Sequence, residues 1–100
     1  MEYTKIINGN ICTVTMDGKF TFSDHKEFKN LLNLTLDVDI KNIQLDISGI
    51  EFIDSAGMGL FLLMKDEAAK KSILLTLLNP KGQVKKMFDI SKFNTLFHIE

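Results

Sequence analysis

The sequence contains no arginine and no tryptophan, and it has one cysteine and one proline in 100 residues. All 12 basic residues are lysine, so the bidentate contacts by which guanidinium groups hold phosphates and carboxylates are absent. Arginine also makes the commonest specific base contact, so direct nucleic-acid binding is not expected. The lone Cys12 excludes an intramolecular disulfide and fits a reducing compartment.

Long apolar runs and a leader-like N-terminus are also missing. No stretch approaches the ~18 consecutive apolar residues of a membrane span, and residues 1–5 lack the basic and apolar regions of a signal peptide. We therefore expect a cytoplasmic protein that does not associate with membranes. A composition of 45% hydrophobic and 25% charged residues is that of an ordinary globular chain, so residues 1–100 are expected to form one domain.

The N-terminal third of the chain predicts a hairpin followed by a helix. The Asn8-Gly9-Asn10 turn separates residues 6–7 from residues 11–16, where apolar and polar side chains alternate as in a half-buried strand. We expect Asp17-Gly18 to close that strand and a helix to begin near Asp24.

Strand and helix patterns then alternate along the rest of the chain. Residues 43–47 are predicted as a strand that Ser48-Gly49 interrupts and that residues 50–53 continue, and residues 73–78 and 96–97 are predicted as further strands. Helices are predicted to start at Asp54-Ser55 and at Asn79-Pro80. This order predicts an α/β fold: a mainly parallel sheet, entered through an N-terminal β-hairpin and covered by helices.

The most informative segment joins the second of these strands to its helix through Asp54-Ser55. Ser55 is placed at a helix N-terminus, where unpaired N–H groups and the macrodipole favour negative charge. A phosphate on Ser55 would gain those donors without an arginine. The same two residues also fit an ordinary helix N-cap, and the residue pattern alone leaves both interpretations open.

The helix that follows is unusual because no residue from Ala56 to Met64 is polar. Gly57 and Gly59 each lower helix propensity by ~1 kcal/mol relative to alanine, but they allow another backbone or a partner to come close. Either this helix is buried on all sides or its first turns expose an apolar patch. Because complete burial is difficult in so small a domain, we favour the patch.

Residues 52–59, Phe-Ile-Asp-Ser-Ala-Gly-Met-Gly, preceded by Leu-Asp-Ile-Ser at 45–48, resemble the signature of the STAS domain. More narrowly, they resemble bacterial anti-sigma-factor antagonists. The resemblance implies a single-domain STAS-like fold and a partner switch. Ser55 would be phosphorylated by a GHKL-type serine kinase that is also the anti-sigma factor. The unphosphorylated chain would bind that kinase, the phosphorylated chain would release it, and a metal-dependent serine phosphatase would reset the system.

The resemblance also implies roles for the neighbours of Ser55. Asp54 would orient the serine hydroxyl, and Asp54, Ala56 and Gly57 would form the supporting loop. We predict that Met58, Gly59 and Leu62 contact the partner. The kinase would supply the chemistry, so the chain would be a substrate rather than an enzyme, without catalytic residues, cofactor or metal.

Other functions fit the sequence less well. A serine hydrolase would need Gly-x-Ser-x-Gly, but Ile53 stands where the first glycine belongs. No Gly-rich phosphate loop is present, and Cys12 has no metal-ligating neighbours. The remaining alternative is a STAS module that does not use phosphorylation of Ser55 and acts as a scaffold or senses a small ligand. The Asp54-Ser55 pair favours the phosphorylated antagonist.

Overall fold

The computed structural model describes all 100 residues and contains one five-stranded sheet with the strand order β1-β2-β3-β4-β5. The strands are β1 (Glu2–Asn8), β2 (Ile11–Phe20), β3 (Asn42–Ile53), β4 (Leu74–Leu78) and β5 (His98–Ile99). The α-helices are α1 (His25–Leu32), α2 (Ser55–Lys70) and α3 (Gly82–Ser91). Three short 3-10 helices complete the chain: η1 (Phe22–Asp24), η2 (Asn33–Leu36) and η3 (Phe93–Thr95).

The sheet is mixed in the way that the sequence predicts. β1 pairs antiparallel with β2 through a two-residue turn in which Gly9 has a φ of +63°, and the other neighbouring strands pair parallel. Each parallel connection carries a helix, as such crossovers require. The predicted single-domain α/β fold with an N-terminal hairpin is therefore confirmed.

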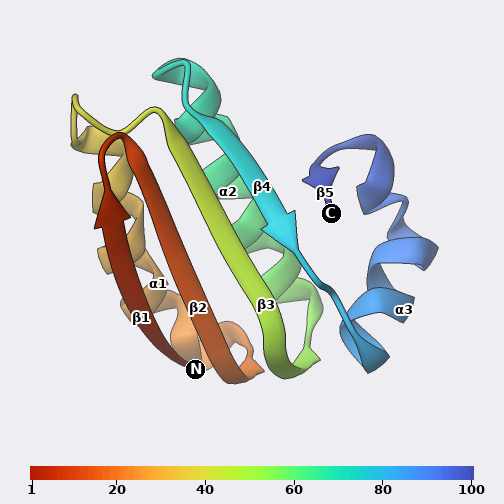
Figure 1. Cartoon of the computed structure of the whole chain (residues 1–100). Helices are drawn as coiled ribbons and strands as arrows, with labels where there is room; N and C mark the ends of the chain where they lie inside the picture. The colour runs from red at the N-terminus through yellow and green to blue at the C-terminus, as the bar shows by residue number, and fades with distance from the viewer.

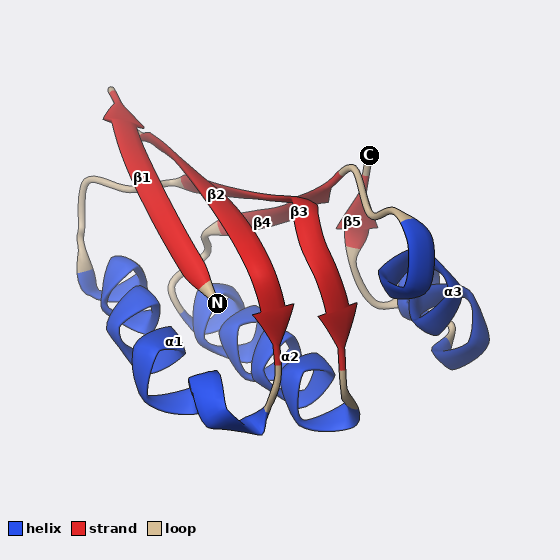
Figure 2. Ribbon diagram, turned by 90° about the horizontal axis from the view of Figure 1, so that it is seen from below, coloured by secondary structure: helices blue, strands red, loops and turns tan.

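The helices cover only one face of the sheet. Figures 1 and 2 show α1 and α2 packed against the same face of β1–β4, with α3 beside β4 and β5. Alternate residues of the strands, such as Val14, Leu45 and Leu77, are fully buried on that face. Phe20, at the end of β2, packs against Phe28 of α1 and Phe61 of α2 at ring-centroid distances of 5.1 and 4.9 Å. The core thus joins the sheet to the two helices.

The central strands run further than the sequence predicts. β2 continues past Asp17-Gly18 to Phe20, with shifts in its register against β3 before Asp17 and after Gly18. A Cβ atom at Gly49 of β3 would lie 2.9 Å from the Met16 carbonyl oxygen and still closer to the Asp17 carboxylate. Gly49 therefore permits the close approach of β2 and β3 at this irregularity, and it does not end the strand.

The prediction that α3 begins at Asn79-Pro80 is wrong. Asn79 adopts a left-handed conformation with a φ of +60°, and its N–H donates to the Glu100 carbonyl at 2.8 Å. Asn79 therefore extends the backbone pairing between β4 and β5 by one residue on each strand. The helix α3 begins only at Gly82, after Lys81. The last strand likewise lies at His98–Ile99 rather than at residues 96–97.

Candidate functional site

Asp54 is the N-cap of α2. Its backbone is extended (φ −102°, ψ 179°), and one carboxylate oxygen accepts the Gly57 N–H at 2.8 Å. The other oxygen accepts the Phe22 N–H at 3.2 Å, while the Asp54 N–H donates to the Phe20 carbonyl at 3.3 Å. One side chain therefore caps the helix and fixes it to the segment that follows β2.

Gly57 allows α2 to come close to β2. A Cβ atom at this position would lie 2.5 Å from the Phe20 carbonyl oxygen and 2.9 Å from a side-chain carbon of Ile53. The neighbour for which this glycine makes room is thus the backbone of the same chain. Gly57 therefore holds the start of α2 close to β2 by a steric route.

Ser55 is the first residue of α2, and its side chain is exposed to solvent. Ala56, which follows it, is half-buried. One amide of the first turn, that of Gly57, already donates to Asp54. A phosphate on Ser55 would therefore lie at the positive end of the helix but would share it with the carboxylate of Asp54.

The exposed side of α2 is narrower than the predicted patch. The face toward the core contains Gly57, Met58, Leu60, Phe61, Met64 and Ala68. Met58 is only 6% exposed, so its predicted contact with a partner is corrected: it belongs to the core, because it lies within one helical turn of Phe61 on the side facing the sheet. Gly59 is exposed, and a Cβ atom added to it would have no neighbour within 4 Å, while Leu62 is half-buried. These two predicted contact residues remain accessible.

Sequence reasoning missed Phe22, whose ring is 69% exposed. Its backbone N–H is held by Asp54, and its ring stacks on His25 at a centroid distance of 5.8 Å. The alternation of Phe20, which is buried, with Phe22, which is exposed, was the available signal. Leu63 on α2, at 38% exposed, adds a further accessible apolar side chain beside Gly59. We call Phe22, Ser55, Gly59, Leu62 and Leu63 the acceptor surface.

Gln83 in the first turn of α3 reaches the strand that leads to Ser55. Its side-chain oxygen accepts the Ile53 N–H and its side-chain nitrogen donates to the Ile53 carbonyl, both at 2.9 Å. The amide therefore pairs with Ile53 as a neighbouring strand would, two residues before Ser55. No sequence pattern indicated this contact, because the two residues are 30 positions apart.

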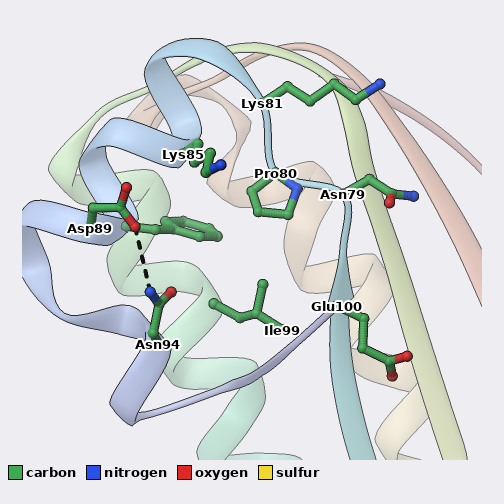
Figure 3. Close-up of a pocket in the computed structure, with 9 residues that line it drawn as sticks. Asn79, Pro80, Lys81, Lys85, Asp89, Asn94, Ile99 and Glu100 are labelled. Atoms are coloured by element: carbon green, nitrogen blue, oxygen red, sulfur yellow. Dashed lines mark hydrogen bonds between the residues drawn. The ribbon is translucent and has the colours of Figure 1, made fainter.

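A pocket of about 580 Å³ lies between α3, η3 and the end of β5. Figure 3 shows Lys85, Asp89 and Asn94 on the side of α3 and η3, and Asn79 and Lys81 also line the pocket. Its polar groups are exposed side chains, and it is separate from the acceptor surface.

The side chains of Asn79 and Lys81 also act on Asp46 of β3. Burial favours the neutral form of Asp46, but hydrogen bonds from Ser48 and Asn79 and the charge of Lys81 outweigh it. The pKa of Asp46 is therefore held below its ordinary value of 3.8.

The structure offers neither a metal site nor a membrane span. No three His, Cys, Asp or Glu side chains gather in a group that could hold a metal ion. None of the helices is both long and apolar enough to cross a membrane.

The chain has relatives among known proteins. It is 27% identical over 92 residues to a STAS-domain containing protein of Pseudomonas aeruginosa, and the match covers 92% of this chain and 90% of that protein. The aligned region therefore spans nearly the full length of both proteins.

Solved structures with the same fold differ in what they do. SpoIIAA, an anti-sigma factor antagonist, superimposes in its unphosphorylated form with a TM-score of 0.77 at 16% identity, covering 99% of this chain and 87% of that one. In its phosphorylated form SpoIIAA, a Bacillus cell fate determinant, gives 0.75 at 17%, covering 99% and 91%. A sulfate transporter family protein from Wolinella succinogenes gives 0.79 at 16%, covering 95% and 80%. The STAS domain model matches residues 2–100, and the chain therefore belongs to the STAS domain family.

Proposed function

We propose that this protein is a phosphorylatable anti-sigma-factor antagonist. In its unphosphorylated form it binds an anti-sigma factor that is also a GHKL-type serine kinase, and phosphorylation of Ser55 releases that partner. A metal-dependent serine phosphatase restores the binding form. The protein is the substrate in this cycle and acts in the cytoplasm.

The observation that carries the proposal is the placement of Ser55. Its side chain is exposed at the first position of α2, although the residues around it are held by hydrogen bonds that join Asp54 to two different segments. A kinase could thus reach the hydroxyl, which stands on a backbone held by these hydrogen bonds. The exposed Phe22, whose N–H is bonded to Asp54, gives a partner apolar surface near that hydroxyl, and the exposed Leu63 adds to it about two turns further along α2.

The charges around Ser55 explain how phosphorylation would release a partner. A phosphate adds about −1.5 to −2 charge, and it would stand next to the carboxylate of Asp54, which is fixed at the helix cap. The partner would then have to desolvate a dianion within an apolar contact. A loss of ~3 kcal/mol in binding free energy weakens the complex about a hundredfold.

Intact-mass spectrometry tests the acceptor. The purified chain is incubated with ATP and a lysate of its native host, beside the Ser55→Ala and Ser23→Ala variants. Ser23 is an exposed serine on η1 and serves as the matched control. We expect one phosphate on the wild type and on Ser23→Ala, and none on Ser55→Ala. A phosphate retained by Ser55→Ala would place the acceptor elsewhere.

A second experiment tests the acceptor surface. The partner captured by the wild type is titrated with the chain carrying phosphoserine at position 55 and with Gly59→Asp. Both are expected to bind at least tenfold more weakly. Ala69→Asp, also on an exposed position of α2 but nearly three turns further on, should bind as the wild type does. Equal binding by Gly59→Asp would contradict this assignment.

A second candidate function is a STAS module that is not phosphorylated and acts as a scaffold or ligand sensor. The likeness in fold to a sulfate transporter family protein favours it, because the same fold occurs there in a protein of a different kind. The two candidates differ in one result: only the antagonist loses its partner when Ser55 carries a phosphate.

A further inference from the structure

One side of α3 adjoins the loop that leads to Ser55. Gln83, in the first turn of α3, binds both backbone groups of Ile53, two residues before Ser55. Met87 and Ile90 follow Gln83 at spacings of four and seven residues, so they lie on the same side of the helix. Figure 1 shows that α2 and α3 both begin at the lower edge of the sheet. The side of α3 that carries Gln83 therefore continues the surface around Ser55.

Ile90 is the exposed apolar residue of this side. Its side chain is 78% exposed, whereas Phe88 is buried and packs against Phe61 of α2 at a ring-centroid distance of 6.3 Å. Met87 is half-buried against the core. A single exposed isoleucine is common on protein surfaces, but this one stands on a helix that packs against α2, which carries most of the acceptor surface. Ile90 therefore extends the apolar area of that surface onto α3.

The segment that contains this side is positively charged. Residues 79–92 carry four lysines and one acidic residue, Asp89, a net charge of +3. All four lysines are exposed, and the three ion pairs of the structure involve none of them. One of the four, Lys86, lies on the side of Gln83 and Ile90, three residues after the first and four before the second. We call Lys86, Met87 and Ile90 the α3 flank.

We propose that the α3 flank binds an acidic region of the kinase that phosphorylates Ser55. This inference rests on the function proposed above. The ammonium group of Lys86 has no ion-pair partner within the chain, so it is free to meet a carboxylate of the kinase, and the side chain of Ile90 supplies an apolar contact beside it. Complementary charge of this kind speeds association and fixes the orientation of two proteins.

The release of the partner requires the same sign of charge. A phosphate on Ser55 adds about −1.5 to −2 charge close to the α3 flank. A basic region of the kinase would be held more tightly by that phosphate, and phosphorylation would then strengthen the complex. An acidic region is attracted by Lys86 before phosphorylation and repelled by the phosphate afterwards. One acidic region of the kinase therefore accounts for both binding and release.

Titration with the purified kinase tests the α3 flank. ATP is left out so that Ser55 stays unmodified. Lys86→Glu reverses the charge of the flank and should raise the dissociation constant about tenfold, mainly by slowing association. Ile90→Ser removes the exposed apolar side chain and should raise the dissociation constant about fivefold, mainly by speeding dissociation.

Lys85→Glu is the matched control. It makes the same change of charge one residue away, but Lys85 lines the pocket on the other side of α3. Charges more than about 8 Å apart are largely screened at about 0.15 M ionic strength, so this variant should bind within about twofold of the wild type. Circular dichroism establishes that each variant is folded, which the exposure of all three substituted side chains favours.

Carbodiimide cross-linking identifies the sign of the partner's charge directly. The reagent forms an amide between a lysine amine and a carboxylate without adding a spacer, and it takes up the water that is lost as a urea. In the complex, Lys86 should be joined to an aspartate or glutamate of the kinase. The chain that carries phosphoserine at position 55 should give no such product.

Three results would overturn the inference alone, while phosphoserine at position 55 still releases the kinase. These are unchanged binding by Lys86→Glu, tighter binding by Lys86→Glu, and equal weakening by Lys86→Glu and Lys85→Glu. If the phosphoserine chain binds the kinase as tightly as the unmodified chain, the function proposed above fails, and the inference fails with it.

Discussion

The N-termini of α2 and α3 lie close together, but they are held in different ways. Asp54 caps α2 with its carboxylate, its N–H binds the Phe20 carbonyl, and Gly57 lets the helix approach that same carbonyl. At α3 the N-cap residue, Lys81, makes no side-chain capping bond. Gln83 alone ties that helix to Ile53 by its side chain.

The two helix N-termini differ in the contacts that hold their backbones in place. In the function proposed above, the start of α2 presents Ser55 to a kinase, and its backbone is held in place while the side chain stays exposed. At α2 this is achieved by several independent contacts that fix the residues on both sides of Ser55. At α3 the side-chain hydrogen bonds to Ile53 all come from one amide, that of Gln83, so a single substitution should remove them. The following substitutions test this contrast.

Gly57→Ala should have the largest effect. The added methyl group would lie 2.5 Å from the Phe20 carbonyl oxygen, so the helix or the strand must move, at a cost of about 2–3 kcal/mol in unfolding free energy. Gly59→Ala is the matched control, because the space around it is open and alanine favours the helix by about 0.5–1 kcal/mol. Urea denaturation measures the unfolding free energy of both variants. If the two variants had equal stability, close approach to β2 would not be what requires Gly57.

Asp54→Ala should have the next largest effect. It removes the cap and leaves the N–H groups of Gly57 and Phe22 without their acceptor, at a cost of about 2 kcal/mol. Asp54→Asn keeps an acceptor oxygen and should lose less. Asp66→Ala, at an exposed position of the same helix, should change the urea midpoint little. A loss of similar size in Asp66→Ala would show that charge on α2, and not the cap, is responsible.

The sequence could predict the start of α2 because its signals are local. An extended apolar segment, Asp54 as a cap and a following apolar helix all lie within a few residues, and the structure keeps each of them. The same local reasoning was wrong at Asn79-Pro80. There the N–H of Asn79 bonds to Glu100, which lies 21 positions further along the chain, and this pairing determines the backbone. Tertiary contacts thus overrode a good capping pattern.

Part of the candidate site was also beyond sequence reasoning. An apolar run from Ala56 to Met64 has no polar residue to mark its outer side, so the pattern could not decide that Met58 is buried while Gly59 is exposed. That choice depends on where β2 and β3 lie. The contributions of Phe22 and Gln83 required the fold as well, because each acts on a residue some 30 positions away.

Gln83→Ala should have a smaller effect on stability, about 1 kcal/mol, because it removes two neutral hydrogen bonds. Its effect on the hydrogen exchange of nearby backbone amides should be larger. The Ile53 amide would lose its acceptor, so its hydrogen exchange measured by NMR should become faster, while the Gly57 amide, which is bonded to Asp54, should stay protected. Gln83→Met, which keeps the side-chain length without the amide, should behave like Gln83→Ala. Protection of Ile53 in both variants would mean that Gln83 does not link α3 to the acceptor loop.

Asp46→Asn should have the smallest effect on stability, and it tests the contacts of the segment that precedes α3. The pKa of Asp46 is lowered in the folded protein despite burial, by Ser48, Asn79 and Lys81, and two of these three residues lie in the segment that leads to α3. A carboxyl group with a lowered folded pKa contributes stability above its unfolded value of about 3.9, and that contribution is lost as the pH falls through the folded pKa. The melting temperature of the wild type should therefore fall below about pH 4, and the melting temperature of Asp46→Asn should fall less steeply over the same pH range. Because Asp46 binds the segment before α3 and not the loop at Ser55, the acid-induced loss of hydrogen-exchange protection should appear first at the Asn79 amide, which donates to the Glu100 carbonyl. An equal loss of protection at Gly57 would show that the two helix starts respond to acid as one unit.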